Sequence, residues 1–280
     1  MLKKIVKIAA IQTKASVDIS ANLKQAEIKI KQAARQGAKI ICLPELYRTV
    51  YFPQKISKDF EKYAETIPGE STQAFSKLAK ELKVIIIAPI FEKAKNGNFY
   101  NSAAVIDETG KLLPAYRKIH IPHDPLFYEQ SYFKPGDTGY KIHKTKFATF
   151  AVLICYDQWF PEAARAAALA GAEIIFYPTA IGNIAGYKAP EGDWHEAWET
   201  IQRSHAIANS VFVVAVNRVG IENKLNFWGQ SFITDAFGKV LKRASSTKEE
   251  VITADLNLAT IKPTRAGWGF FRNRRPDTYK

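Results

Sequence analysis

Apolar residues recur along this chain at two spacings, one typical of amphipathic helices and one typical of strands buried on both faces. The helical spacing predicts helices over 18–36, 71–82, 161–170 and 195–209. Continuous apolar runs predict strands over 5–12, 40–43, 84–91, 174–177 and 211–216. Because strands that are apolar throughout need cover on both faces, this alternation predicts an α/β fold with helices packed on its sheets.

The order of helix and strand occurs twice along the chain, and part of the sequence repeats with it. Residues 37–44 resemble residues 171–178 at an offset of 134, and residues 84–88 resemble residues 211–215 at an offset of 127. Nearly equal offsets favour two related halves. Two such halves can stack sheet on sheet with helices outside, giving a four-layer α-β-β-α sandwich, or can form one doubly wound sheet. Periodicity leaves both arrangements open.

Turn signals predict hairpins in the rest of the chain. Glycine-containing turns at 96–98 and 108–111 bound a strand over 99–107. A similar turn at 235–239 joins strands over 227–234 and 240–244, and a further strand is expected over 250–255. These segments predict antiparallel additions to the central strands.

The last segment of the chain carries three aromatic residues, Trp268, Phe270 and Phe271, among charged ones. A solvated tail rarely holds so many aromatics, so we expect it to pack against a second subunit. The sequence thus predicts a single domain over 1–280, with a C-terminal tail at 261–280 that lies at the interface of a homodimer or larger homo-oligomer.

Composition narrows the class of protein. Hydrophobic residues make up 47% of the 280 positions and charged residues 24%, which is typical of globular proteins and excludes disorder and fibres. The longest apolar runs fall far short of the roughly 20 residues that a bilayer requires, so no membrane partner is predicted. Segment 1–12 begins like a secretory signal, but Lys7 interrupts its apolar run, and we expect a core strand there.

Cysteine content and charge argue against disulfide-rich, zinc-binding and nucleic-acid-binding proteins. Cys42 and Cys155 are too few for a disulfide framework and too far apart for a zinc site, which predicts a reducing cytoplasm and no bound metal. The net charge is +13, from 40 basic and 27 acidic residues, but the basic residues are scattered except near the C-terminus. Nucleic-acid binding requires a basic patch, so no nucleic-acid partner is predicted.

Three polar residues lie immediately beyond a strand or on an extended segment, where α/β folds gather their active sites: Glu45 after the strand 40–43, Lys118 after a hairpin, and Cys155 at the end of the apolar run 151–154. Each has an ordinary explanation when taken alone, because a cysteine at a strand end is usually a small core residue, a lysine is usually solvated, and a glutamate often begins a helix. Cys42, inside a strand, is assigned to the core. His120 and His123 lack companion ligands and are read as hydrogen-bonded loop residues.

Together the three residues make a coherent chemistry. A cysteine can attack a carbonyl carbon once an ammonium favours the thiolate and a carboxylate accepts the proton. The ammonium of Lys118 and the backbone N–H of Tyr156 can then stabilise the oxyanion, and Glu45 can return the proton to a departing nitrogen and later activate water. This predicts a hydrolase that needs no metal or organic cofactor.

The segments around these residues resemble the nitrilase superfamily of carbon–nitrogen hydrolases, which has a Glu-Lys-Cys triad in the same chain order. The matching segments are 43–46, 116–118 and 154–157, and the similarity runs from Ile5 to the C-terminus. The resemblance implies the α-β-β-α sandwich, assembly into oligomers, and a second glutamate, Glu129, that lies beside the lysine and helps to place the substrate nitrogen.

Within this family the chain is most similar to members that hydrolyse N-carbamoylputrescine on the route from agmatine to putrescine. The similarity is carried by segments 51–52, 128–139, 157–165, 177–182, 202–209, 217–218 and 272–276. It implies carbon dioxide and ammonia as the other products. The alternatives are members that act on N-carbamoyl-β-alanine (β-ureidopropionases) or on monoamides of dicarboxylic acids (ω-amidases), which would need a cation for the substrate carboxylate. The resemblance and position of the segments predict these substrate-binding residues: Tyr51, Tyr156, Trp159, Thr179, Ala180, Tyr187 and Glu191.

The chain departs from these relatives after Gly182, where it reads Asn183-Ile184-Ala185-Gly186-Tyr187. A diamine substrate ends in a cationic amine, which a carboxylate or an aromatic face would bind. Tyr187, Glu191 and Asp193 are the candidates for this contact.

Overall fold

Two six-stranded sheets form the centre of the computed structural model, which describes residues 4–279. The first sheet has the order β15-β1-β2-β3-β4-β5, and the second has the order β14-β13-β10-β8-β7-β6. The strands of the first sheet are β1 (Ile5–Gln12), β2 (Ile40–Cys42), β3 (Ile85–Lys93), β4 (Phe99–Ile106), β5 (Leu112–Arg117) and β15 (Glu250–Asn257). Those of the second are β6 (Ile142–Lys144), β7 (Thr149–Val152), β8 (Ile174–Pro178), β10 (Phe212–Val216), β13 (Phe232–Thr234) and β14 (Val240–Arg243).

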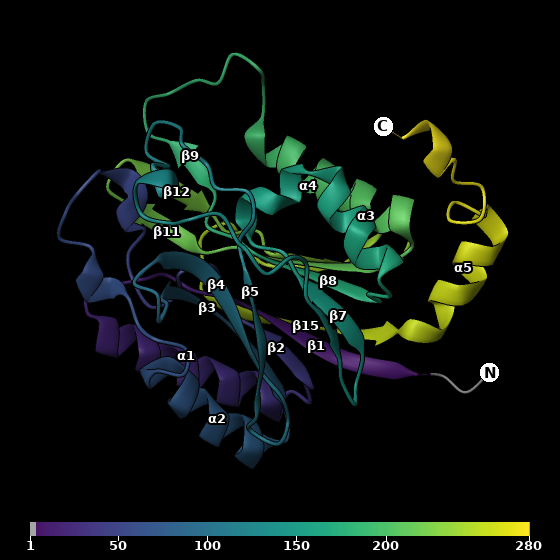
Figure 1. The fold of residues 1–280 in the computed structure, drawn as a ribbon, viewed down its shortest axis with the longest axis horizontal. Coiled ribbons are helices and arrows are strands. Elements are labelled where there is room, and N and C mark those ends of the chain that lie inside the picture. The colour runs from purple at the N-terminus through teal and green to yellow at the C-terminus, as the bar shows by residue number, and fades with distance from the viewer. Residues whose placement is uncertain (1–3, 280) are drawn as a thin grey trace.

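Helices cover the outer face of each sheet (Figure 1). Helices α1 (Ile19–Arg35) and α2 (Glu70–Leu82) pack on the first sheet, and α3 (Pro161–Leu169) and α4 (Trp194–Asn209) pack on the second. The predicted α-β-β-α sandwich is therefore confirmed, and the alternative of one doubly wound sheet is wrong. Local sequence helps to start these helices, since Asp18 accepts a hydrogen bond from the Ala21 N–H at 3.0 Å and Pro161 occupies the first turn of α3.

Alternation along the strands divides the core into layers. In the first sheet, Ile8 and Ile40 belong to the apolar cluster shared with the second sheet, whereas their neighbours Ala9 and Ile41 belong to the cluster beneath α1 and α2. Cys42 lies in the layer between the sheets and is fully buried, as its assignment to the core required.

The two halves have the same topology, which confirms the repeat. In each half, three strands run parallel and alternate with two helices, β1-α1-β2-α2-β3 and β7-α3-β8-α4-β10. Antiparallel strands then extend both edges, β4, β5 and β15 in one sheet and β13, β14 and β6 in the other. The sequence match at 37–44 and 171–178 places Glu45 and Thr179 at equivalent positions after β2 and β8.

One predicted strand is wrong. The segment 227–234 is two strands, because β12 (Leu225–Trp228) pairs with β11 (Val219–Glu222) and β9 (Gly182–Ile184) in a separate small sheet, while β13 joins the second large sheet. The chain turns between them at Gly229 and Gln230, whose φ angles are 61° and 51°. A strand cannot pass through two residues in the left-handed region, so the run is broken there.

Short 3₁₀ helices complete the described structure: η1 (Phe52–Gln54), η2 (Glu61–Tyr63), η3 (Glu129–Ser131), η4 (Cys155–Trp159), η5 (Leu258–Thr260) and η6 (Pro276–Thr278). None of the helices within residues 4–279 is both long enough and apolar enough to cross a bilayer.

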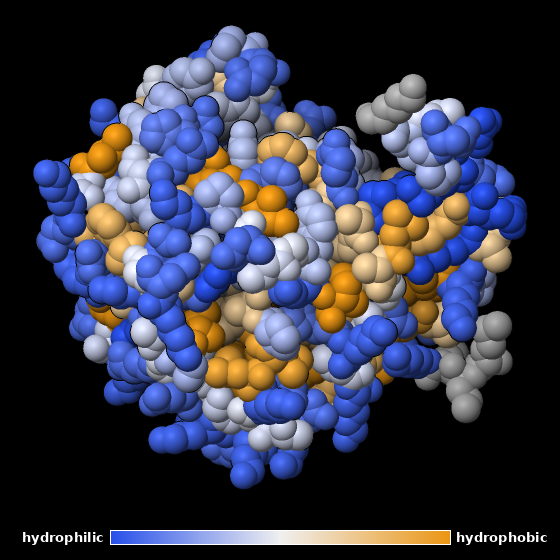
Figure 2. Space-filling model, viewed as in Figure 1, coloured by the Kyte–Doolittle hydropathy of each residue, from blue (hydrophilic) through white to orange (hydrophobic). Residues whose placement is uncertain are grey.

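The C-terminal segment begins with a helix, α5 (Ile261–Trp268), and packs on the second half of the chain (Figure 1). The Arg265 guanidinium donates to the carbonyls of Asn209 and Ala172 at 3.3 Å and lies over the Phe271 ring. Trp268 stacks on Phe237 but stays 57% exposed, and apolar groups gather on this side of the visible face (Figure 2). The tail therefore has intramolecular contacts, and its place at a subunit interface stays a prediction.

Candidate active site

Glu45, Lys118 and Cys155 come from different strands and meet at one end of the two sheets. Glu45 follows β2, Lys118 follows β5, and Cys155 follows β7 and begins η4. Lys118 Nζ lies 2.8 Å from Glu45 Oε1 and 2.7 Å from Glu129 Oε2, and all three side chains are fully buried. The structure thus brings the predicted lysine and both predicted glutamates into direct contact.

The two oxygens of Glu45 have different surroundings. Oε1 accepts hydrogen bonds from Lys118 Nζ and from Asn101 Nδ2, both at 2.8 Å, whereas the buried Oε2 has no hydrogen-bond partner among the described residues. A buried carboxylate oxygen without a partner is costly unless it is used. One oxygen therefore fixes the side chain and the other is available to take a proton.

Glu129, on η3, is held from both sides. Its Oε1 accepts a hydrogen bond from the Tyr51 hydroxyl at 2.7 Å, and its Oε2 faces Lys118. Burial raises the pKa of Glu129 and nearby Glu45 raises it further, while Lys118 lowers it, with a net increase. Burial alone would lower the pKa of Lys118, but Glu129 and Glu45 reverse the effect, so the lysine is held as an ammonium.

Cys155 sits at a strained turn between strand and helix. Its φ of 43° is rare for a residue with a side chain, and it costs about 1–3 kcal/mol that the surrounding structure must supply. The residue is 7% exposed. Burial, Glu45 and Glu129 raise the pKa of its thiol well above the usual value, against the opposite effects of Lys118 and the Ala180 backbone N–H. The ammonium therefore offsets only part of the increase, and the resting sulfur is a neutral thiol that must lose its proton as it attacks.

Asp157 ties the segment that carries the cysteine to the segment that carries the lysine. Its carboxylate accepts hydrogen bonds from the Ile154 N–H at 2.8 Å and the Tyr116 hydroxyl at 2.7 Å. It also accepts from the His120 N–H at 3.0 Å and lies 2.7 Å from His120 Nδ1. His120 is thus a hydrogen-bonded residue, as predicted.

The predicted substrate-binding residues fall into three groups. Tyr51 contacts Glu129, and the Ala180 N–H faces the Cys155 thiol, while Tyr156 follows the cysteine directly and is half-buried. Thr179 is buried, and its hydroxyl donates to Gln158 Oε1 at 3.2 Å and to the Tyr177 carbonyl at 3.0 Å. Trp159 packs against the cluster around Trp198.

The remaining predicted residues lie on the surface loop before α4. Tyr187 and Glu191 both contact Trp194. Asp193 caps α4 through the N–H groups of His195 and Glu196. The roles of these residues in binding substrate stay predictions.

Sequence reasoning missed three residues near the triad: Asn101, Asp157 and Asp124. Asn101 lies inside the otherwise apolar strand β4, and a buried amide in such a strand is the signal that could have identified it. Asp124 is close enough to the Tyr156 phenol to raise its pKa, after the larger effect of burial. It is an exposed carboxylate, called the rim residue here because it lies near Tyr156, the residue after the cysteine.

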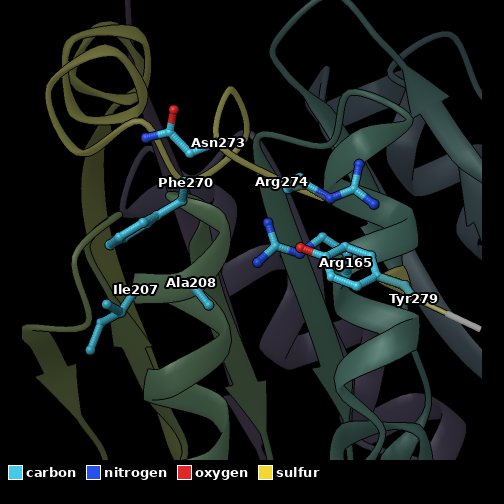
Figure 3. A pocket seen from close by; sticks show the side chains of 7 residues that line it. All are labelled: Arg165, Ile207, Ala208, Phe270, Asn273, Arg274 and Tyr279. Carbon is cyan, nitrogen blue, oxygen red and sulfur yellow. The ribbon is translucent and has the colours of Figure 1, made fainter. Parts of the chain in front are cut away.

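A metal site, or a pocket elsewhere within residues 4–279, would be a second candidate site. No group of three or more His, Cys, Asp or Glu side chains within 4–279 is arranged to hold a metal ion. A surface pocket of about 480 Å³ is lined by Arg165, Arg274, Phe270 and other residues of α3, α4 and the C-terminal segment (Figure 3), and the triad is not part of its wall.

Comparison with known proteins identifies the family. The sequence profile described as "Carbon-nitrogen hydrolase" matches residues 7–266. The chain belongs to the carbon–nitrogen hydrolase family. Among its relatives, the N-carbamoylputrescine amidase of Oryza sativa is 46% identical over 98% of this chain and 93% of that protein. The citrullinase of Francisella tularensis is 39% identical over 98% of this chain and 96% of that protein.

The fold agrees with this family. A carbon–nitrogen hydrolase from Helicobacter pylori superposes with a TM-score of 0.93 at 37% identity, covering 98% of this chain and 97% of that one. This carbon–nitrogen hydrolase therefore has both the sequence and the architecture of the group that the resemblance implied.

Proposed function

We propose that this hydrolase converts N-carbamoylputrescine and water to putrescine, carbon dioxide and ammonia, a step of putrescine synthesis from agmatine. The observation that carries the proposal is the buried cluster in which Lys118 bridges Glu45 and Glu129 beside the Cys155 thiol. The identity of 46% to the rice enzyme, over almost the full length of both chains, supports this substrate.

The first half-reaction forms a covalent intermediate. Cys155 Sγ attacks the ureido carbon while its proton passes to Glu45, whose Oε2 is free to receive it. The Lys118 ammonium and the Tyr156 backbone N–H stabilise the oxyanion. The C–NH₂ bond then breaks, ammonia leaves with the proton from Glu45, and a carbamoyl thioester bearing the putrescine moiety remains on Cys155.

The second half-reaction uses water. Glu45, again a carboxylate, takes a proton from the water that attacks the thioester carbon. The C–S bond breaks and the thiol regains the proton. The released carbamate decomposes to carbon dioxide and putrescine. All proton transfers pass through one carboxylate, so the scheme requires no metal or organic cofactor.

An exposed carboxylate, Asp124, lies close enough to the Tyr156 phenol to raise its pKa, after the larger effect of burial. An ammonium at the far end of the substrate would be attracted by this charge, whereas a carboxylate there would be repelled. Glu45, Lys118 and Glu129 act on the reacting ureido group and do not separate the candidate substrates.

A panel of amides tests the proposal by ammonia release. The panel contains N-carbamoylputrescine, citrulline, N-carbamoyl-β-alanine and succinic acid monoamide. We expect the highest kcat/KM for N-carbamoylputrescine and none for the Cys155→Ala variant. Faster turnover of a carboxylate-bearing compound would refute the substrate assignment, and turnover by Cys155→Ala would refute the mechanism.

Citrulline is the second candidate, because the chain is 39% identical to a citrullinase and citrulline carries the same terminal ureido group. It also has an α-amine beside its carboxylate, so the panel separates the two compounds directly. We further propose that the protein acts in the cytoplasm and assembles as a homo-oligomer through the face that carries α5. The exposed Trp268 and Phe237 on that face support the assembly.

A further inference from the structure

A buried ion pair lies directly behind the catalytic glutamate. Arg218, between β10 and β11, is 1% exposed, and its Nη1 lies 2.6 Å from Glu222 Oε1. Its Nη2 donates to the carbonyls of Glu45 and Leu46 at 2.9 Å and approaches that of Thr49 at 3.2 Å. One guanidinium from the second half of the chain thus holds the turn that carries Glu45 in the first half.

The other oxygen of Glu222 extends this contact to Glu129. Glu222 Oε2 accepts a hydrogen bond from the Tyr51 N–H at 2.5 Å, and the Tyr51 hydroxyl in turn bonds Glu129 Oε1. The ion pair therefore supports the backbone on both sides of the loop 46–51 and, through Tyr51, the second glutamate.

The held turn is one that the chain would not adopt freely. Leu46, directly after Glu45, has a φ of 48°, which a branched aliphatic residue rarely takes. Such conformations persist only where surrounding contacts over-determine them, and the Leu46 carbonyl is one of those that Arg218 binds.

The residue before Arg218 contacts the other side of the site. Asn217 Oδ1 accepts from the Ile181 N–H at 3.1 Å, and its Nδ2 donates to the Ile181 carbonyl at 3.0 Å. Ile181 follows Ala180, whose N–H faces the Cys155 thiol. Asn217 thus holds the backbone next to Cys155, and Arg218 holds the backbone next to Glu45.

We infer that the Arg218–Glu222 pair is a positioning device that sets the distance between Glu45 Oε2 and Cys155 Sγ across the two sheets. The inference rests on the proposed roles of Glu45 and Cys155. Arg218 touches no reacting atom. It acts through the backbone of residues 45–49, which carries the Glu45 side chain, while Lys118 and Asn101 hold Oε1 at the other end of that side chain.

The test compares Arg218→Met with Arg243→Met. Arg243 also pairs with a glutamate, Glu199, at 2.6 and 2.8 Å, but this pair is more exposed and joins β14 to α4, and the Arg243 guanidinium lies over the Phe232 ring. We expect Arg218→Met to lower kcat about 100-fold, the loss typical of a misplacement near 1 Å, with KM changed less than about threefold. Arg243→Met should retain both constants. Arg218→Lys should recover only part of kcat, because an ammonium cannot reach Glu222 and the carbonyls together.

A second readout does not depend on the substrate. Alkylation of Cys155 by iodoacetamide at pH 7 should become several-fold faster in Arg218→Met than in wild type, because Glu45 raises the pKa of the thiol and its displacement lowers that pKa. If the wild type turns over no ureido compound, the proposed function fails, and the alkylation rates still test the positioning. A variant with a lower melting temperature but with kcat and alkylation rate like those of Arg243→Met would overturn the inference.

Should Arg218→Met fail to fold, Glu222→Gln carries the test. Glutamine keeps the shape and one acceptor oxygen, so the Arg218 and Tyr51 N–H contacts cannot both be kept at full strength. We expect about a tenfold loss of kcat with a folded circular dichroism spectrum, by the magnitude of one lost charge-assisted hydrogen bond. An unchanged kcat in this variant would equally overturn the inference.

Discussion

Replacing Glu129 by glutamine should change thiol reactivity and turnover in opposite directions. The substitution keeps the side-chain shape but removes one of the two negative charges that face Lys118. Because Glu129 raises the pKa of the Cys155 thiol, its neutralisation should lower that pKa and speed alkylation by iodoacetamide at neutral pH. Glu129 also raises the pKa of Lys118, so the lysine should hold its proton less strongly.

Turnover of the Glu129→Gln variant should fall because glutamine accepts fewer hydrogen bonds than the Glu129 carboxylate. Glu129 binds the Tyr51 hydroxyl and Lys118, both at 2.7 Å, and a glutamine has one acceptor oxygen for these two donors. Loss of one hydrogen bond to a charged group corresponds to about 1.5–3 kcal/mol, which is roughly a 10- to 100-fold fall in kcat if it is expressed in the transition state. Ammonia release measures kcat, and alkylation followed from pH 6 to 10 measures the thiol. A kcat within twofold of wild type, or an alkylation profile moved to higher pH, would refute this reasoning.

Three further predictions concern the rim, the connection behind the site and the core. Asp124→Asn should raise KM for N-carbamoylputrescine about threefold, by loss of one exposed charge contact. It should leave KM unchanged for N-carbamoylbutylamine, which lacks the amine, and equal effects on both compounds would argue against amine recognition. Asp157→Asn should lower both kcat and the melting temperature, because the amide cannot accept all the hydrogen bonds that Ile154, Tyr116 and His120 donate. An unaltered kcat in a protein with a lower melting temperature would show that Asp157 has a purely structural role. Burial lowers the pKa of His143 to about 4, below that of the unfolded chain, so stability should fall as pH drops from about 6.5 towards 4, by about 2 kcal/mol at pH 5. Denaturant unfolding at pH 7 and pH 5 should show a smaller loss in His143→Gln, and an equal loss in both proteins would contradict the assignment.

The central layers of the fold follow from the sequence because β2, β3, β8 and β10 are apolar over most of their length and each helix has one apolar face. The two sequence matches also identify β2 and β8, and β3 and β10, as equivalent strands of the two halves, and the topology confirms this because β2 runs parallel to β3 and β8 runs parallel to β10. The small sheet was missed because β9 and β11 have three or four residues each, too few for a periodicity to show. Helix α5 was missed because Pro263 and Gly267 lie within its eight residues.

Part of the candidate site could likewise be predicted from the sequence, and part of it could not. Glu45, Lys118 and Cys155 could be named from the sequence because each lies within three residues of the end of a strand or apolar run, and strand ends meet at a sheet edge. The contacts of Asp157 with Tyr116 and His120, and of Arg218 with the carbonyls of residues 45–49, could not be predicted, since these partners lie far along the chain and only the fold brings them near. The sequence predicted that Lys118 would lower the pKa of the Cys155 thiol. The structure shows that burial, Glu45 and Glu129 together raise this pKa by more than Lys118 lowers it.

The covalent intermediate offers the most direct test of the central claim. Wild-type protein mixed with N-carbamoylputrescine, quenched in acid within milliseconds and digested, should show the Cys155 peptide carrying the mass of the substrate less one ammonia. The Cys155→Ala protein should show neither adduct nor ammonia release. Turnover without an adduct on Cys155, or an adduct on another residue that forms and decays at the rate of turnover, would contradict the account.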